Sequence, residues 1–381
     1  MKNFLTDQYT VDKKYKIKHN YLKEQFNDYK NIFKKISKVI KFNDFTLGFE
    51  VQNFENNFKK IISSKHCIGV GSGTDAIYLA LKCLGLKSGD EVITTPYTFY
   101  ATINAIIQAD CVPKFVDAQA DFNINADLIE ASITKKTKAI LVVHWAGRVC
   151  EMNRIRKIAK KNNLFIVEDA CHAALAKKDN VFAGNFGDIG CFSLHPLKNL
   201  NVWGDGGMIV TKSNKYNNKL RLLRNHGLIN RNQIKIFGIN SRLDTIQAVV
   251  ANHLLKKLPQ ITFKRINNAK LIDKKLRNIK QIYIPKRIKN LKEVFHIYSL
   301  QVKKRNGLVK FLNSKGIDAK KHYPIPMHLQ SPLKKLHKYK KGDFPVAEKL
   351  SNETISLPVH EFLTVNQLNF MCDKIREFYL K

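Results

Sequence analysis

Residues 67–84, CIGVGSGTDAIYLALKCL, predict a strand, a glycine-rich turn and a helix, and this unit decides the fold class. One face of the predicted helix at 74–84 carries Ala76, Ile77, Ala80, Leu81 and Leu84. The glycines allow close approach of the backbone, and the first N–H groups of a helix can bind a phosphate. The turn lacks the spacing of a Rossmann or P-loop motif. It therefore indicates either a phosphate site or a tight strand–helix connection.

Outward from this unit, short apolar runs alternate with helical stretches. The runs lie at 67–70, 91–94, 112–116, 139–143, 164–167, 189–193 and 208–211. Strands that alternate with helices favour the α/β class, with a mainly parallel mixed sheet covered by helices. The last two runs have no helix between them, which leaves room for one antiparallel strand.

The two ends of the chain depart from this alternation. Residues 18–47 are polar, Lys-rich and helical in pattern, and 50–62 resemble an amphipathic helix. A helix at 245–257, ended by Pro259, and a Lys-rich helix at 263–277 precede a smaller α+β region. We expect an N-terminal arm and large domain over 1–255 and a small C-terminal domain over 256–381.

Composition indicates a globular protein. The chain has 381 residues, and 44% of them are apolar. No stretch is long and apolar enough for a membrane helix, and Met1–Asp7 lacks the apolar core of a signal peptide, so we expect a cytoplasmic protein that binds no membrane. Its seven cysteines form no C-x-x-C pair, which predicts neither a disulfide framework nor a metal site.

The net charge of +35 is the extreme property of the chain. The lysines are spread along its length, with no basic tail and no recognisable nucleic-acid-binding module, so we expect no nucleic-acid partner. A non-catalytic, basic nucleic-acid-binding regulatory protein remains an alternative. A positive field would also attract an anionic small molecule.

Two further stretches carry candidate chemistry. Glu168 and Asp169 end an apolar strand, at the sheet edge where α/β proteins bind ligands. An acid there could bind a metal, act as a base, pair with a protonated ring nitrogen or cap the next segment, and His172 could simply be packed. Lys198 follows a buried strand and lies between Pro196 and the glycines at 204–207. Desolvation of such a lysine lowers its pKa and favours imine formation.

In this order, the motifs resemble the DegT/StrS family of pyridoxal 5′-phosphate (PLP)-dependent sugar aminotransferases. The resemblance extends over about residues 18–381 and rests on the segments 48–55, 71–76, 89–93, 98–102, 168–170, 193–198, 224–227, 240–248, 322–326 and 343–348. It implies a PLP-dependent transferase-like fold of the aspartate aminotransferase type.

The resemblance also implies roles for particular residues. Lys198 would form a Schiff base with PLP and move a proton, Asp169 would pair with the pyridinium nitrogen, and His172 would lie near the cofactor. The phosphate would bind to Gly73, Thr74, Asp75 and Ser193, while Phe99 would stack on the ring. Asn240 would reach the phosphate from a partner subunit, which implies a homodimer with a shared active site. His322 and Tyr323 would line the substrate pocket.

The implied reaction is transfer of an amino group from L-glutamate to a ketone of a nucleotide-linked deoxysugar, for polysaccharide or glycoconjugate biosynthesis. A 3-keto sugar is favoured over a 4-keto sugar.

A PLP-dependent sugar dehydratase is the alternative within enzymes, but some relatives with that chemistry carry His in place of Lys198. Arg148, where relatives usually have Gln, and Trp203 depart from the family pattern and could alter substrate choice.

Overall fold

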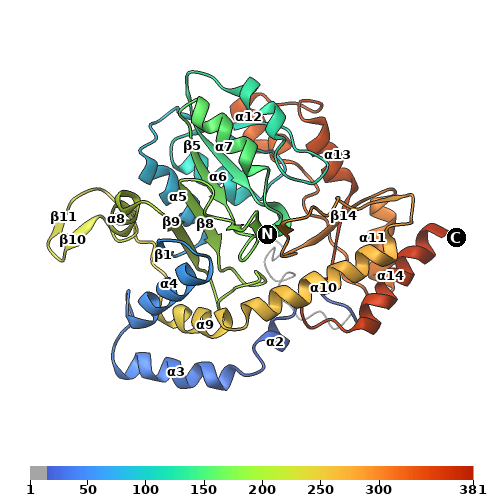
Figure 1. The fold of residues 1–381 in the computed structure, drawn as a ribbon, viewed down its shortest axis with the longest axis horizontal. Coiled ribbons are helices and arrows are strands. Elements are labelled where there is room, and N and C mark those ends of the chain that lie inside the picture. The colour runs from blue at the N-terminus through green and yellow to red at the C-terminus, as the bar shows by residue number, and fades with distance from the viewer. Residues whose placement is uncertain (1–14, 381) are drawn as a thin grey trace.

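The structure, a computed structural model, describes residues 15–380, so the prediction about Met1–Asp7 lies outside the described residues. Its centre is a seven-stranded sheet in the order β1-β9-β8-β5-β4-β2-β3 (Figure 1). The strands are β1 (His66–Val70), β2 (Glu91–Thr94), β3 (Val112–Phe115), β4 (Thr137–Val143), β5 (Phe165–Asp169), β8 (Ile189–Ser193) and β9 (Gly207–Thr211). All seven predicted apolar runs are therefore strands of one sheet.

The sheet is mixed but mainly parallel, as predicted. Strands β8, β5, β4, β2 and β3 run parallel to one another, and β9 is antiparallel to both of its neighbours, β8 and β1. Antiparallel neighbours need no crossover helix, which explains the short connection between the last two apolar runs.

Helices cover both faces of the sheet. One face packs on α3 (Tyr29–Lys41), α4 (Phe49–Ile61), α7 (Met152–Lys161) and α9 (Thr245–Leu255), and the other on α5 (Gly73–Leu84), α6 (Tyr100–Gln108) and α8 (Asn214–Leu223). Ile93 and Ile140 belong to the first core, whereas their chain neighbours Val92 and Leu141 belong to the second. Because successive side chains of a strand point to opposite faces, both faces of the sheet are buried.

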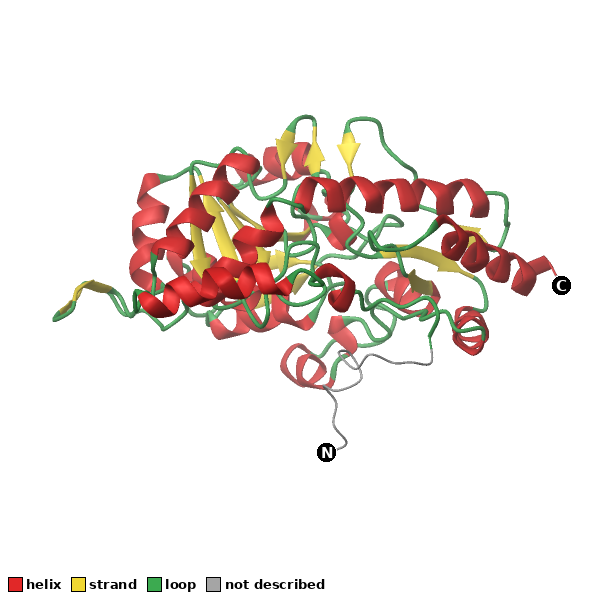
Figure 2. Cartoon of the chain, turned by 90° about the horizontal axis from the view of Figure 1, so that it is seen from below, coloured by secondary structure: helices red, strands yellow, loops and turns green. Residues whose placement is uncertain are grey.

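A smaller region follows, centred on an antiparallel sheet of β12 (Ile282–Tyr283), β14 (Tyr298–Val302) and β15 (Thr354–Leu357). It shares a core with α10 (Leu258–Leu276), α11 (Arg305–Ser314) and α14 (Val365–Leu380), and Ile17 of the N-terminal segment joins that core. Figure 2 shows the two sheets at opposite ends of the long axis. Helix α10 contributes to both cores, and the predicted domain boundary at 255 stays a proposal.

The remaining elements are short. They are α2 (Leu22–Gln25), α12 (Ser331–His337), α13 (Pro345–Glu353), β6 (Lys177–Lys178), β7 (Val181–Phe182), β10 (Leu228–Asn230), β11 (Gln233–Ile234), β13 (Leu291–Lys292) and the 3-10 turns η1 (Ala126–Leu128), η2 (Glu130–Ser132), η3 (Trp145–Gly147) and η4 (Met327–Leu329). The β10–β11 hairpin projects away from the body in Figures 1 and 2.

Pro259 has a different role from the predicted one. It was expected to end the helix that begins at Thr245, but that helix already ends at Leu255, and Pro259 lies in the first turn of α10. A proline is tolerated there because the first N–H groups of a helix have no partner within it. The predicted Lys-rich helix consequently begins at Leu258 rather than at 263.

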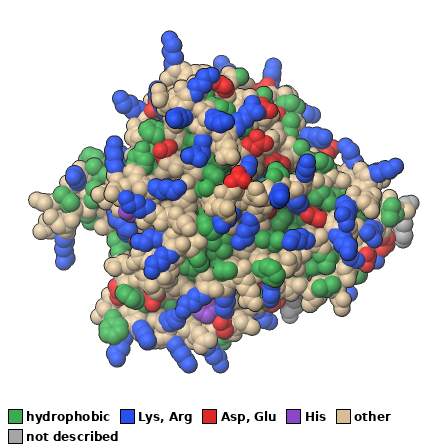
Figure 3. Space-filling model, in the orientation of Figure 1, with side chains coloured by type: hydrophobic (Ala, Val, Ile, Leu, Met, Phe, Trp, Pro, Cys, Tyr) green, Lys and Arg blue, Asp and Glu red, His purple; other side chains and the backbone are tan. Residues whose placement is uncertain are grey.

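Lysine and arginine side chains are scattered over the face shown in Figure 3 and do not gather in one patch. All seven cysteines are free. Across residues 15–380, no helix has the length and apolar character that crossing a membrane requires.

Candidate active site

The sheet topology brings four predicted segments to one edge. Strands β1, β5 and β8 end there, and the antiparallel β9 begins there, with Gly207 paired to both Val70 and Ser193. The turn after β1, the acid that ends β5 and the loop after β8 therefore meet at the carboxyl edge, where ligands bind in this class of sheet.

The turn after β1 leads into the N-terminus of α5. The Ser72 hydroxyl accepts a hydrogen bond from the Asp75 N–H (3.0 Å), which leaves the earlier N–H groups of Gly73 and Thr74 as donors for an anion. A Cβ atom at Gly73 would lie 2.7 Å from Ser193 Cβ, and one at Gly207 would lie 2.2 Å from the Ser72 carbonyl oxygen. A side chain does not fit at either position, because the Ser193 side chain lies against Gly73 and the Ser72 backbone lies against Gly207.

Lys198 is enclosed beside this turn. It lines a small cavity with Cys171, His172 and Ser193. Burial lowers the pKa of the Lys198 ammonium group, although the nearby Cys171 and Asp169 oppose that shift. A lysine with a lowered pKa has more of its amine in the neutral, nucleophilic form at neutral pH, as imine formation requires.

Asp169, at the end of β5, is held in a fixed orientation. One carboxylate oxygen accepts a hydrogen bond from the Thr102 hydroxyl (2.8 Å), and the other accepts one from the Cys171 N–H (3.1 Å). The Thr102 hydroxyl also contacts that of Thr98 at 2.8 Å. A buried, oriented carboxylate can pair with a protonated ring nitrogen.

Glu168 has a structural role, unlike its neighbour. It is fully buried on the opposite face of β5 and accepts hydrogen bonds from three backbone N–H groups, at Gly184, Phe186 and Gly187. The His144 ring lies 2.8 Å from it. These contacts satisfy its carboxylate, so Asp169 alone of the two acids faces Lys198.

His172 packs beside the same lysine. Its ring centroid lies 4.5 Å from that of His296 and 5.7 Å from that of Trp145. Its Nδ1 atom accepts a hydrogen bond from the Ala146 N–H (3.3 Å). Burial, followed by the charge of Lys198, lowers the pKa of the His172 ring, which is therefore neutral at neutral pH.

Aromatic side chains form a wall of the site. The Tyr323 ring lies 5.7 Å from Phe99 and 5.3 Å from Trp145, while Phe99 remains 37% exposed. The His322 Nδ1 atom lies 2.9 Å from the Ser356 hydroxyl, and burial lowers the pKa of its ring to about 3. The structure thus places the predicted pocket residue Tyr323 between His322 and the predicted stacking residue Phe99.

Asn240 lies away from the other predicted site residues. It is exposed and pairs with Asn225 in an isolated β-bridge. Its neighbour Ser241 instead reaches the turn, accepting a hydrogen bond from the Gly71 N–H and donating one to the Asp75 carboxylate (2.7 Å). Contact between Asn240 and a cofactor of a partner subunit stays a proposal.

The two departures from the family pattern have structural explanations. Arg148 is buried and forms ion pairs with Asp121 (2.9 Å) and Glu293 (2.6 Å). Trp203 donates its backbone N–H to Gln247 and packs its ring against the aromatic side chains of Phe26 and Phe33. Arg148 therefore supports the fold around the site, and Trp203 secures the N-terminal segment.

Three residues near the site, Thr102, Trp145 and His296, have no role that the sequence predicts. Thr102 lies in the 98–102 segment, four residues after Thr98, and this helical spacing could have indicated that the two hydroxyls face one another. His296 reaches Lys198 from the region that follows the large sheet, so no local pattern could have found it.

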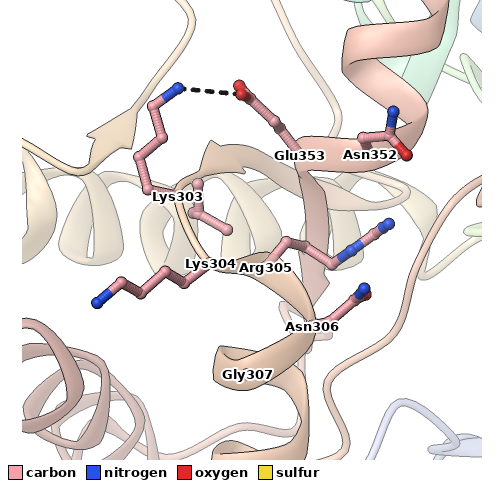
Figure 4. A pocket seen from close by; sticks show the side chains of 8 residues that line it. Lys303, Lys304, Arg305, Asn306, Gly307, Asn352 and Glu353 are labelled. Carbon is pink, nitrogen blue, oxygen red and sulfur yellow. Dashed lines mark hydrogen bonds and ion pairs between the residues drawn. The ribbon is translucent and has the colours of Figure 1, made fainter.

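A separate hollow of about 300 Å³ lies at the N-terminus of α11 (Figure 4). Two of its three cations have partners: Lys303 pairs with Glu353 at 3.0 Å, and Arg305 donates to the carbonyl oxygens of Ser351 and Thr354. None of the predicted site residues lines it.

Known proteins resemble the chain over nearly its full length. The sequence profile of the DegT/DnrJ/EryC1/StrS aminotransferase family matches residues 27–376. A "pleiotropic regulatory protein" of Geobacillus stearothermophilus is 37% identical, with 94% of this chain and 97% of that protein covered. A UDP-N-acetyl-3-dehydro-α-D-glucosamine 3-aminotransferase of Acidithiobacillus ferrooxidans is 36% identical, with 90% and 92% covered.

A solved structure shows the same fold. The crystal structure of DesV from S. venezuelae, in complex with a ketimine intermediate, superimposes with a TM-score of 0.92 at 31% identity. The match covers 96% of this chain and 98% of that chain.

Proposed function

Because the chain belongs to the DegT/DnrJ/EryC1/StrS aminotransferase family, we propose that it transfers an amino group from L-glutamate to a ketone of a nucleotide-linked sugar. It is an aminotransferase, and its cofactor is PLP. The observation that carries the proposal is the position of Lys198, which is partly buried, has a lowered pKa and lies near the Asp169 carboxylate and the glycine turn.

The residues at the sheet edge fit PLP. No side chain fits at Gly73 beside Ser193, so the backbone N–H groups at the start of α5 stay uncovered. Such N–H groups are suited to binding the phosphate. The Lys198 amine would meet the aldehyde, and Asp169 would face the ring nitrogen. The turn, the lysine and the aspartate thus match the phosphate, the aldehyde and the ring nitrogen of the cofactor.

When bound, the cofactor withdraws electrons from the Cα atom of the amino donor, so that its proton can be removed. The neutral amine of Lys198 would take that proton and return it to C4′. Asp169, oriented by Thr102, keeps the proton on the ring nitrogen. The neutral His172 and the wall around Tyr323 limit the access of water.

The substrate class is inferred from relatives and from charge. A 36% identical relative is named for a UDP-linked 3-dehydro sugar, which supports a nucleotide-linked 3-keto sugar here. The net charge of +35 favours the approach of a substrate that carries a diphosphate. A relative of Bacillus subtilis named as a spore coat polysaccharide biosynthesis protein supports a role in polysaccharide biosynthesis, which we place in the cytoplasm.

We also infer a homodimer with a shared active site. The projecting β10–β11 hairpin leads to Phe237, which is 92% exposed, and then to Asn240. Ile229 and Ile234 of the hairpin are also more than half exposed, and a second copy would bury this apolar surface and let Asn240 reach the phosphate of its partner.

The dimer can be tested by complementation. If Asn240 completes the partner's site, the Lys198→Ala and Asn240→Ala variants should each be inactive alone. Refolding them together should restore part of the activity, because mixed dimers contain one intact site. Failure of the mixture to recover any activity would contradict a shared site.

The reaction is tested with a panel of 3-keto and 4-keto nucleotide sugars, PLP and L-glutamate. We expect one 2-oxoglutarate per amino sugar, with the 3-keto sugars preferred. Loss of water from the sugar without consumption of glutamate would indicate the dehydratase alternative. Absence of any turnover, together with salt-sensitive binding of DNA or RNA, would instead support the regulatory alternative.

A further inference from the structure

A buried tyrosine from the N-terminal segment supports the backbone that carries Lys198. The Tyr21 hydroxyl donates to the carbonyl oxygen of Leu197 (2.9 Å) and lies 3.3 Å from that of Lys198. Leu197 has a φ of 73°, in the left-handed region that non-glycine residues rarely adopt. Such a conformation persists only where surrounding contacts hold it.

Tyr21 is itself held on both sides. Its ring stacks on that of His360 at 5.0 Å, and the Arg265 guanidinium lies 4.9 Å from its centroid. Burial raises the pKa of the Tyr21 hydroxyl, so it stays protonated and can donate at every working pH.

A second set of hydrogen bonds involves the carbonyl group of Lys198. The Asn201 side-chain amide donates to the Lys198 carbonyl oxygen (2.8 Å) and to the Gln25 side chain (2.7 Å). Gln25 donates to Glu361 at 3.2 Å, and Glu361 accepts a hydrogen bond from Arg265 at 3.1 Å. These side chains are all buried and come from four segments that are distant in sequence.

We propose that Tyr21, with Gln25 and Asn201, is a positioning residue that fixes the Leu197–Lys198 backbone and so presents the Lys198 amine to the cofactor aldehyde. This inference rests on the proposed role of Lys198. The amine lone pair attacks the aldehyde carbon, a C=N bond replaces the C=O bond, and one water leaves. A backbone that is already fixed avoids the entropy loss of ordering the lysine at that step.

Two forms of the cofactor separate positioning from general structural support. PLP has the aldehyde that reacts with Lys198, whereas pyridoxamine 5′-phosphate (PMP) has an amine there and cannot form that bond. Both share the ring and phosphate. A contact that only presents Lys198 should therefore affect the binding of PLP and not that of PMP.

The experiment measures the Kd of PLP and of PMP for the full-length apoprotein by fluorescence titration. In Tyr21→Phe we expect the Kd of PLP to rise about three- to tenfold, the effect of one lost hydrogen bond. The Kd of PMP should change less than about twofold. Tyr298→Phe is the matched control, because it removes a buried hydroxyl that binds Asp273 and not the lysine loop.

Equal weakening of both ligands, or no change, would overturn the proposal. If Tyr21→Phe does not fold, Gln25→Leu serves instead, since it breaks the relay to Asn201 without touching Lys198, and the same selective effect is required. Lys198→Ala tests the premise separately. It should abolish the advantage of PLP over PMP, and if the advantage remains, the proposed role of Lys198 fails rather than that of Tyr21.

Discussion

Lys198 differs from the other cations of the chain in its surroundings. Burial lowers its pKa, whereas most lysines lie on the surface, and Asp169 and Cys171 lie close to it. Asp169 depends in turn on Thr102, whose hydroxyl is its side-chain donor. A defined hydrogen bond therefore orients the carboxylate that lies close to Lys198 at the sheet edge.

Replacing Thr102 by valine tests that dependence. Thr102→Val keeps the shape but removes the hydroxyl, so Asp169 loses one of its two donors and its orientation. We expect kcat to fall about tenfold, since one hydrogen bond to a charged group contributes about 1.5 kcal/mol. Steady-state kinetics with glutamate and a keto sugar provides the measurement.

Thr262→Val is the matched control for this substitution. Thr262 is fully buried in α10, and its hydroxyl has no hydrogen-bond partner within residues 15–380. The control should retain kcat. Equal losses in the two variants would show that Thr102 acts through packing alone.

The residues differ in how far sequence could identify them. Asp169 ends a strand, and Lys198 and the Gly73 turn follow strands. Because strand ends of a parallel sheet meet at one edge, the proximity of these residues is predictable. The period of two along β5 also separates Glu168 from Asp169. Tyr21 and His296 reach Lys198 only through tertiary packing of distant segments, for which one sequence holds no local signal.

At the scale of elements, Arg148 joins three parts of the chain. It follows β4 and binds Asp121, Glu293 and the Lys286 carbonyl oxygen. Glu293 also pairs with Arg287 at 2.9 Å. This cluster ties the large sheet to the segment that precedes β14, which carries His296 into the site.

Arg148→Gln should therefore lower stability and leave specificity unchanged. It removes a cation from two acids, one of them only 9% exposed, and we expect a loss of about 3 kcal/mol in unfolding free energy. Arg154→Gln, which breaks the exposed pair with Asp127, should cost less than about 1 kcal/mol. Urea denaturation measures both changes, and a change in sugar preference without a stability loss would contradict the structural role.

At the scale of the whole molecule, two histidines with lowered pKa values, His322 and His360, predict sensitivity to acid. Burial lowers the pKa of His322 and of His360 to about 3, below the usual value of 6.5. The unfolded chain therefore binds protons between pH 6.5 and 3 that the folded chain does not bind. By linkage, stability is complete above pH 6.5 and is lost progressively as pH falls toward 3.

His360→Gln removes one such group. The wild-type unfolding free energy should fall between pH 6 and 4, and each such histidine contributes up to about 1.4 kcal/mol per pH unit. In His360→Gln, the slope of the unfolding free energy against pH should be smaller by that amount. In His226→Gln, which changes an exposed position, this slope should stay at the wild-type value. Denaturation curves at several pH values provide the measurement, and equal slopes for all three proteins would contradict the account.

The central claim, that Lys198 alone carries the cofactor, is tested most directly by borohydride reduction of the purified holoenzyme followed by peptide mass spectrometry. Reduction fixes PLP on the lysine to which it is bound. We expect one phosphopyridoxyl group, on the peptide that contains Lys198, in a chain with 66 lysine and arginine residues. A modification at another lysine, or no modified peptide from active enzyme, would contradict it.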